Sequence, residues 1–309
     1  MGKKYKLMKN QSICPLCNFK QKKIYKVAPI VYGDKTRKKA FFLCKNCDVR
    51  YLFPRLNKKQ EKFFYRMEFE KFMEKRSGKT SGWLKAQEHI SKNRETFIRR
   101  MKYIKPYLKN KKSILEVGCS SGFMLFPLIK KGFKCSGIEP SGVFSKYLKK
   151  KNIDVHSSIE DLIKNKKEKF DLIIHFFVLE HISDPIKFIK NLLSLLTKKG
   201  QIIFEIPNVA EPLHTIYNIP AFEKFYWSIA HHWYFSEKSL KYVLDKTNKS
   251  YKIKLDQRYD LSNHITWIKD GKPGGMKRFS KMIGKKNEER YKNELIKFRK
   301  CDTLIGIIG

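Results

Sequence analysis

The stretch ILEVGCSSG, residues 114–122, decides the fold. Ser113–Val117 has the apolar character of a short strand, and the chain then turns at Gly118 into a helical stretch. Glycine lets the backbone approach a ligand closely, and the start of a helix presents unpaired N–H groups that can hold it. A strand, a glycine turn and a helix in this order predict a nucleotide-binding unit in a parallel sheet.

On both sides of this unit, short apolar runs alternate with helical stretches, which predicts a mainly parallel sheet covered by helices. The run FDLIIHFF from Phe170 is almost continuously apolar, as in a strand buried on both faces. Seven strands in this order predict a Rossmann-like, doubly wound α/β sheet with a closing hairpin. The expected strands are residues 113–117, 134–138, 154–156, 170–176, 201–206, a weaker one near 264–268, and 302–308.

Two acidic residues lie near the ends of the first two strands. Glu139, in the sequence GIEP, follows the glycine turn by about twenty residues, where a carboxylate can accept hydrogen bonds from both hydroxyls of a ribose. Glu116 precedes Gly118 by two residues, and its charge would repel a dinucleotide pyrophosphate. The pair therefore favours a nucleoside ligand that carries a free ammonium group.

Residues 116–122 resemble the first motif of the class I S-adenosylmethionine-dependent methyltransferases, with Ser120 where a middle glycine is common. The resemblance continues, in the family's order, through FDLII at 170–174, VLEHISDP at 178–185 and GQIIFEIPN at 200–208. It implies a Rossmann-like enzyme with S-adenosylmethionine as co-substrate, whose adenine would meet Ile159 and Glu160. The residues that it places around the cofactor are Glu116, Gly118, Cys119, Ser120, Gly122, Glu139, Ile159, Glu160 and Phe176.

Histidines supply the candidate catalytic bases. A sulfonium methyl group is already activated, so the protein has to align the acceptor, exclude water and, for an alcohol, remove a proton. His181 follows the fourth strand, where it could equally be a packing or capping residue, and AHHWYFS at 230–236 supplies His231 and His232. This second segment resembles sugar and small-molecule methyltransferases. In related sugar C-methyltransferases with an N-terminal cysteine module a glutamate stands where Ala230 stands here, which favours transfer to oxygen.

Four of the seven cysteines form two CxxC pairs near the start of the chain. Thiolates at this spacing predict a closed, structural Zn²⁺ site, and a module this small has too little core to fold without a metal. The ligands would be Cys14, Cys17, Cys44 and Cys47. Residues 1–56 are therefore expected to be a zinc-ribbon-like module, 57–110 a charged helical connector interrupted at Ser77-Gly78 and Ser81-Gly82, and 111–309 the Rossmann-like domain.

The formal net charge of +39 would attract phosphates, although the lysines are scattered without an aromatic-interleaved patch. No stretch predicts a membrane span or a secretory signal, so a cytoplasmic protein is expected. The sequence indicates no oligomeric state.

Three functions stay open. The first is methyl transfer to a small-molecule hydroxyl, most simply that of a nucleotide-linked or polysaccharide sugar. The second is an RNA methyltransferase that uses the zinc module and the basic surface to bind RNA. The third is a zinc-ribbon binding protein built on an inactive methyltransferase fold. The basic segment 269–300 is a further candidate for lining an acceptor pocket.

Overall fold

The structure is a computed structural model of the whole chain, and it describes residues 12–77, 85–165 and 168–309. Seven strands form one mixed sheet in the order β10-β11-β8-β7-β4-β5-β6. The central strands pair in parallel, whereas β11 is antiparallel to both of its neighbours. The predicted Rossmann-like sheet with a closing hairpin is confirmed. Its strands are β4 (Ser113–Val117), β5 (Lys134–Ile138), β6 (Asp154–His156), β7 (Phe170–Phe176), β8 (Leu196–Pro207), β10 (Tyr251–Asp256) and β11 (Thr303–Ile308).

The sequence prediction was wrong for the sixth strand. The residues near 264–268 lie in helix α12 (Leu261–Asp270), which the Asp260 side chain caps by accepting from the Asn263 N–H, and which ends at the left-handed Gly271. The β-branched and aromatic residues of this segment resemble a strand, but the caps define a helix. The true strand, β10, alternates lysine with apolar residues at the sheet edge. Strand β8 also begins earlier than predicted, through the polar residues 197–201.

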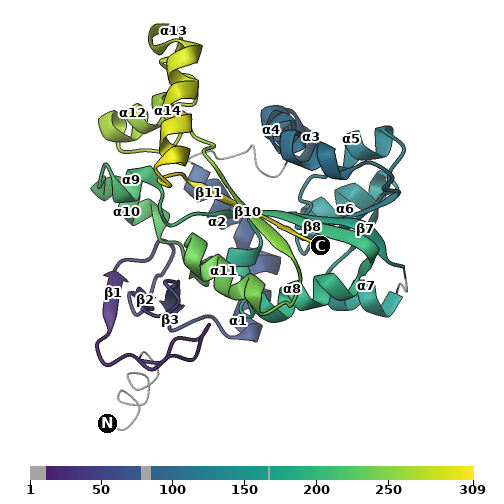
Figure 1. Cartoon of the computed structure of the whole chain (residues 1–309), viewed down its shortest axis with the longest axis horizontal. Helices are drawn as coiled ribbons and strands as arrows, with labels where there is room; N and C mark the ends of the chain where they lie inside the picture. The colour runs from purple at the N-terminus through teal and green to yellow at the C-terminus, as the bar shows by residue number, and fades with distance from the viewer. Residues whose placement is uncertain (1–11, 78–84, 166–167) are drawn as a thin grey trace.

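Helices cover both faces of the sheet, and the alternation of side chains along each strand supplies two cores (Figure 1). On one face, Leu115 and Ile173 pack with α7 (Ile159–Asn165), α8 (Pro185–Ser194) and α11 (Glu237–Asp245). On the other face, Ile114 and Leu172 pack with residues of α4 (Arg94–Ile104), α5 (Leu125–Lys130) and α6 (Gly142–Lys150). Asp184 caps α8, and Pro185 is the first residue of the helix.

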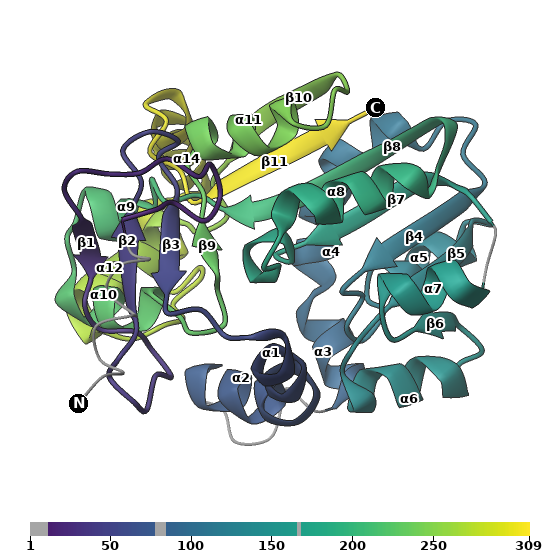
Figure 2. The same ribbon diagram turned by 90° about the horizontal axis from the view of Figure 1, so that it is seen from below.

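A second sheet joins two distant parts of the chain. Its order is β1 (Tyr25–Ala28), β2 (Ala40–Leu43), β3 (Arg50–Phe53) and β9 (Trp233–Tyr234). Figure 2 shows these four strands side by side, to one side of the larger sheet. Strand β9 follows the two adjacent histidines directly, so the cysteine-bearing segment forms a wall behind the predicted acceptor segment. The division of the chain at residues 56 and 110 stays a prediction.

The connector is helical, as expected. It contains α1 (Lys58–Phe63), the π-helical turn η1 (Phe64–Glu68), α2 (Phe69–Ser77), α3 (Ala86–Lys92), α4 and the short 3-10 helix η2 (Lys105–Tyr107). Asn57 and Gln60 form a capping box at the start of α1. Helix α2 ends at Ser77, and the predicted interruption at Gly78, Ser81 and Gly82 lies outside the described residues.

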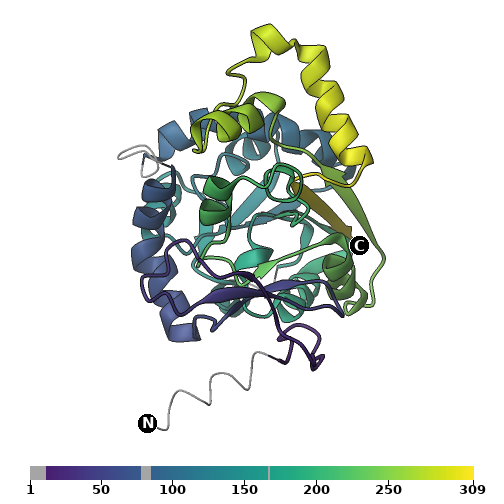
Figure 3. The same cartoon turned by 90° about the vertical axis from the view of Figure 1, so that its left-hand side faces the viewer.

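Five short helical segments and one long helix complete the chain. A 3-10 turn, η3 (Leu179–His181), follows β7, and α9 (Pro212–Thr215) and α10 (Pro220–Tyr226) follow β8. Helices α12, α13 (Ser280–Ile283) and α14 (Lys285–Lys297) project on the side away from β1–β3 (Figure 3). None of the helices in the described ranges is both long and apolar enough to cross a membrane.

Candidate active site

A cavity of about 1010 Å³ opens at the carboxyl ends of β4, β5 and β7. Ligands bind at this edge in open α/β sheets, where the strand order reverses. Residues of the connector helices and of α10 close its other sides. The predicted site residues that line it are Glu116, Gly118, Ser120, Glu139, Ile159, Glu160, Phe176, His181 and His231.

The glycine turn leaves no room for side chains where it meets the cavity. Gly118 has φ +73°, and a Cβ added there would lie 2.8 Å from Cγ2 of Val178. Gly122, with φ +78°, serves packing, since an added Cβ would lie 2.7 Å from Cδ2 of Leu148 and the residue does not line the cavity. The Cys119 thiol is buried against Gly137, and burial raises its pKa, so this residue also contributes backbone and no reactive thiolate.

The two predicted acids are held differently. Both carboxylate oxygens of Glu139 accept backbone hydrogen bonds, from Ser120 N–H at 2.6 Å and from Ser141 N–H at 2.8 Å. These bonds fix the carboxylate across the turn, where it lines the cavity. Glu116 is 1% exposed, and its Oε2 has no hydrogen-bond partner among the described residues. Burial raises the pKa of Glu116, and the nearby Arg100 opposes that shift.

Two imidazoles face each other at the other end of the cavity. The ring centroids of His181 and His231 are 4.7 Å apart at an interplanar angle of 85°. Nδ1 of His181 lies 2.8 Å from the carbonyl oxygen of Ala230, which can only accept. His181 therefore carries its proton on Nδ1, and its Nε2 is left as a proton acceptor. Burial lowers the pKa of His181 to about 4 and lowers that of His231 well below its ordinary value, so both imidazoles are neutral near pH 7.

A carboxylate that the sequence analysis did not select lies beside these rings. Glu180 is 1% exposed, lines the cavity, and has no hydrogen-bond partner for either oxygen in the described part of the chain. Burial raises its pKa to about 8. Ligand atoms of Glu180, His181 and His231 all lie within 4.8 Å of one another. The three groups could share a proton, and two imidazoles with one carboxylate could also hold a divalent cation.

A sequence profile described as a methyltransferase domain matches residues 87–249, more than half of the chain. The chain belongs to this methyltransferase family.

Its relatives match the methyltransferase only in part. The ubiquinone biosynthesis O-methyltransferase of Actinobacillus pleuropneumoniae is 32% identical over 108 residues, which cover 31% of this chain and 46% of that protein. The protein of the same name from Pelagibacter ubique is 36% identical over 99 residues, which cover 30% and 40%. The methyltransferase thus spans about half the length, or less, of these curated relatives.

A solved S-adenosylmethionine-dependent methyltransferase from Archaeoglobus fulgidus has the same fold. The TM-score is 0.50 at 18% identity, over 78% of this chain and 99% of that one. The methyltransferase therefore has the class I methyltransferase fold that the motif at 116–122 indicated.

The residues at the glycine turn fit this cofactor. Glu116 offers a buried oxygen with no hydrogen-bond partner among the described residues to an ammonium group, and the turn at Gly118 presents bare backbone to the cavity. Glu139 is fixed by two backbone N–H groups at the cavity wall, the position predicted for the ribose. Ile159 and Glu160, at the start of α7, line the same end, on the side expected for the adenine.

His232 lies outside the cavity lining of the methyltransferase. Its Nε2 is 3.6 Å from Oε2 of Glu61, and its backbone N–H donates to the Glu180 carbonyl oxygen at 2.8 Å. These contacts fix the backbone next to His231, so a positioning role suits His232 better than proton transfer. As a catalytic residue it stays a prediction.

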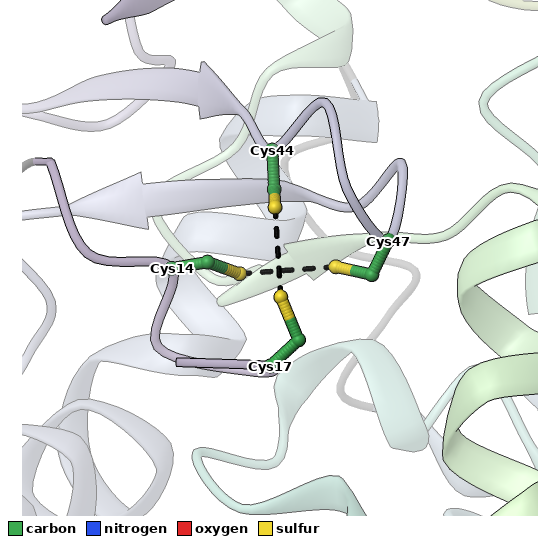
Figure 4. Close-up of side chains that lie close together, drawn as sticks. All are labelled: Cys14, Cys17, Cys44 and Cys47. Atoms are coloured by element: carbon green, nitrogen blue, oxygen red, sulfur yellow. Dashed lines mark hydrogen bonds between the residues drawn. The ribbon is translucent and has the colours of Figure 1, made fainter. Parts of the chain in front are cut away.

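The four N-terminal cysteines come together as predicted (Figure 4). Their sulfurs are 3.8 Å apart for Cys14 and Cys47 and 3.6 Å apart for Cys17 and Cys44. A tetrahedral Zn²⁺ with bonds of about 2.3 Å would separate its sulfurs by about 3.8 Å. The donor set and its spacing therefore fit a closed zinc site.

The two cysteine knuckles have the same local geometry. The residue after each pair, Asn18 or Asp48, has positive φ, and its N–H donates to the carbonyl oxygen of the first cysteine of its pair. Asn and Asp tolerate this left-handed conformation better than other non-glycine residues. The backbone is therefore folded back at both corners to direct two thiols to one point.

The cysteine module of the methyltransferase contacts the acceptor segment directly. Leu52 N–H donates to the His232 carbonyl oxygen at 3.0 Å, and Tyr51 pairs with Trp233 across β3 and β9. Arg55 donates to the Ser183 carbonyl oxygen at 2.8 Å, and its guanidinium lies 5.1 Å from the ring centroid of Trp233. The module thus fixes the backbone on which His231 stands.

The sequence analysis missed three residues of the cavity. Glu180 was available in the quoted motif VLEH, but nothing in the motif shows that it is buried without a partner. Tyr65, whose hydroxyl is 2.9 Å from both His181 Nδ1 and the Ala230 carbonyl oxygen, belongs to a charged helical segment more than a hundred residues away. Arg76 lines the same wall from the end of α2 and had no local signal.

Proposed function

We propose that the methyltransferase transfers the methyl group of S-adenosylmethionine to a hydroxyl oxygen of a small-molecule acceptor, most simply a sugar. The observation that carries this proposal is the pair of neutral imidazoles, His181 and His231, beside Glu180 in the same cavity as the fixed acids Glu116 and Glu139. A cofactor end and a proton-accepting end in one cavity are what alcohol methylation requires.

In the proposed reaction the acceptor oxygen forms a bond to the methyl carbon as the bond from carbon to sulfur breaks. The electron pair of the broken bond stays on sulfur, which gives neutral S-adenosylhomocysteine. The hydroxyl proton passes to the neutral His231, and the resulting imidazolium releases that proton to solvent when the product leaves. Glu180 lies beside this ring, where its carboxyl group can accept a hydrogen bond from the imidazolium. Ala230 and Tyr65 hold the ring of His181 through its Nδ1. Its Nε2 can therefore accept a hydrogen bond from the hydroxyl group of the substrate.

The cavity wall opposite the glycine turn supports a ring-shaped acceptor. It is lined by aromatic side chains, which pack against the apolar face of a sugar. A phenol is the second candidate, because the same rings would stack on it and the curated relatives are named O-methyltransferases. The aromatic residues are Tyr65, Phe69, Phe72, Phe222, Phe225, Tyr226 and Tyr259.

Ala230 favours oxygen over carbon as the methylated atom, because the carboxylate of the sugar C-methyltransferases is absent from that position. Glu180, however, brings a carboxylate to the same pair of histidines. Product analysis therefore has to assign the atom: an O-methyl ether supports the proposal, and a methyl group on carbon contradicts it.

The test is methyl transfer from labelled S-adenosylmethionine into fractionated cell extract. We expect label in the nucleotide-sugar and glycan pool. Label in the phenolic pool would support the second candidate. Label in RNA would instead make the +39 charge part of substrate binding and contradict the proposed small-molecule acceptor. If the protein binds the cofactor but no pool becomes labelled, the result would support an inactive methyltransferase fold.

We further propose that Cys14, Cys17, Cys44 and Cys47 bind a structural Zn²⁺. The support is the tetrahedral spacing of the sulfurs and the burial of three of the four cysteines. Because all four positions around the metal would be filled by thiolates, the ion would have no open position for substrate. Metal analysis of the purified protein, with one zinc expected per chain, tests this assignment.

A further inference from the structure

Arg76 is an exception among the arginines around the cavity. It lines the cavity from the last turn of α2, yet it makes no ion pair and donates no hydrogen bond to any described residue. Its guanidinium carbon lies 4.4 Å from the ring centroid of Phe225 and 5.7 Å from that of Tyr32.

The other two arginines that line the cavity have carboxylate partners. Arg100 donates to Glu205 at 2.9 Å, and Arg258 contacts Asp302 at 3.4 Å. A cation withdrawn from water is normally paired, because its desolvation is otherwise uncompensated. Aromatic faces compensate only part of this cost. Arg76 therefore has donors available for an anion that the protein does not supply.

The surroundings of Arg76 assign it to the acceptor end of the cavity. Burial lowers the pKa of Arg76, and the nearby Tyr234, Tyr32 and Tyr226 oppose that shift. Arg76 in turn lies close enough to His181 and His231 to lower the pKa of both imidazoles. Arg100, by contrast, lies beside Glu116 at the cofactor end. The carboxylate of the cofactor is thus expected near Arg100 and the glycine turn, away from Arg76.

We propose that Arg76 binds an anionic group of the acceptor, a phosphate or a carboxylate, and so selects acidic acceptors over neutral ones. This inference rests on the proposed function, because it takes the histidine end of the cavity as the acceptor site. A guanidinium presents a planar fork of donors that matches two oxygens of such a group. The rings of Tyr32 and Phe225 restrict the side chain in advance, which lowers the entropic cost of binding.

The first test measures protection of single arginines in the wild-type protein. The full chain, saturated with S-adenosylhomocysteine, is treated with phenylglyoxal in about 150 mM salt, which screens the scattered lysines. Modification is mapped by peptide mass spectrometry, with inorganic pyrophosphate or benzoate as probe. Arg66, exposed on the neighbouring π-helical turn, is the internal control.

We expect one probe to slow modification of Arg76 by about ten-fold or more, as a charge-assisted hydrogen bond would, and to leave Arg66 within two-fold. Protection by pyrophosphate identifies a phosphate acceptor, and protection by benzoate a carboxylate. Equal protection of both arginines, or protection of neither, overturns the inference.

The second test compares Arg76→Gln with the matched variant Arg66→Gln. By calorimetry, Arg76→Gln should weaken binding of the effective probe about ten-fold or more and leave the affinity for S-adenosylhomocysteine unchanged. Probe binding that is unaffected in Arg76→Gln contradicts the inference. Loss of S-adenosylhomocysteine binding in that variant would also contradict it, because Arg76 would then belong to the cofactor site. Both readouts are independent of turnover, so they can fail while the proposed methyl transfer stands.

Discussion

Removal of the proposed zinc should release the backbone that carries His231, although the metal site is not part of the cavity. The perturbation is Cys44→Ser, which removes a fully buried ligand. Cysteine modules of this size are held together by the metal itself, with apparent binding free energies of about 10–16 kcal/mol. The variant is therefore expected to lose both the ion and strands β1–β3.

The size of the effect follows from the contacts that β9 and its neighbours would lose. Two neutral hydrogen bonds contribute about 1 kcal/mol each. Leu52 N–H donates to the His232 carbonyl oxygen, and Ser236 Oγ donates to the Asp48 carbonyl oxygen at 3.3 Å. The hydrogen bond of Arg55 to Ser183 contributes about 2 kcal/mol, and its stacking on Trp233 about 0.5–1 kcal/mol. A loss of about 4.5–5 kcal/mol corresponds to an opening equilibrium about 2000–5000-fold more favourable.

Hydrogen–deuterium exchange measures this opening without knowledge of the acceptor. Peptides that cover residues 231–236 should exchange at least 100-fold faster in Cys44→Ser than in the wild type, while the affinity for S-adenosylhomocysteine changes little. Cys135→Ser, which alters a buried cysteine outside the cluster, is the control and should leave this exchange unaltered. Unchanged exchange in a zinc-free protein would refute the claim that the module supports the acceptor wall.

Three further variants test the cavity. Glu116→Gln should weaken S-adenosylmethionine binding by about 10–100-fold, because it removes a charged acceptor for the ammonium, and calorimetry should show no such change for the exposed Glu168→Gln. His231→Ala should lower kcat by about 100-fold or more in the labelled-donor assay, with the cofactor affinity unchanged, and full activity would exclude it as the base. Because burial raises the pKa of Glu180 from its ordinary value of 4.5 to about 8, the native state keeps a proton that the unfolded chain loses. Stability should therefore fall as pH rises across that interval, and Glu180→Gln should flatten the fall in thermal unfolding; an identical pH profile would contradict the burial argument.

The parts of the fold that could be predicted from sequence are those that depend on local pattern. Strand β7 is apolar on both faces, and the glycines at 118 and 122 both adopt the positive φ that the turn requires. The spacing of the cysteines was also sufficient to predict the four-cysteine cluster, because two CxxC pairs are typical of a shared metal site.

The parts that failed depend on contacts between distant residues. The alternating lysines of β10 show one exposed face, but only its pairing with β11 distinguishes a sheet edge from a solvent-exposed loop. The sixth strand failed for a local reason, because residues near 264–268 have strand propensity but the caps at Asp260 and Gly271 define a helix. Pairing of β3 with β9 joins residues about 180 positions apart and has no local signal.

The candidate site likewise contains residues that could be predicted from the sequence and residues that could not. Glu116 and Glu139 follow from their positions at strand ends, which the sheet topology fixes. Glu180, Tyr65 and Arg76 come together only when the connector helices pack over the cavity. The hydrogen bonds of Tyr65 and the absence of one for Glu180 in the described part of the chain are properties of the folded chain.

The central claim is that this cavity binds S-adenosylmethionine through the acids of the glycine turn, and titration calorimetry with the purified chain tests it most directly. The account predicts one site per chain with a dissociation constant below about 1 mM, and loss of that binding in Glu139→Ala with the fold retained. A folded wild-type protein that does not bind S-adenosylmethionine, or a Glu139→Ala variant that binds it equally well, would contradict the account.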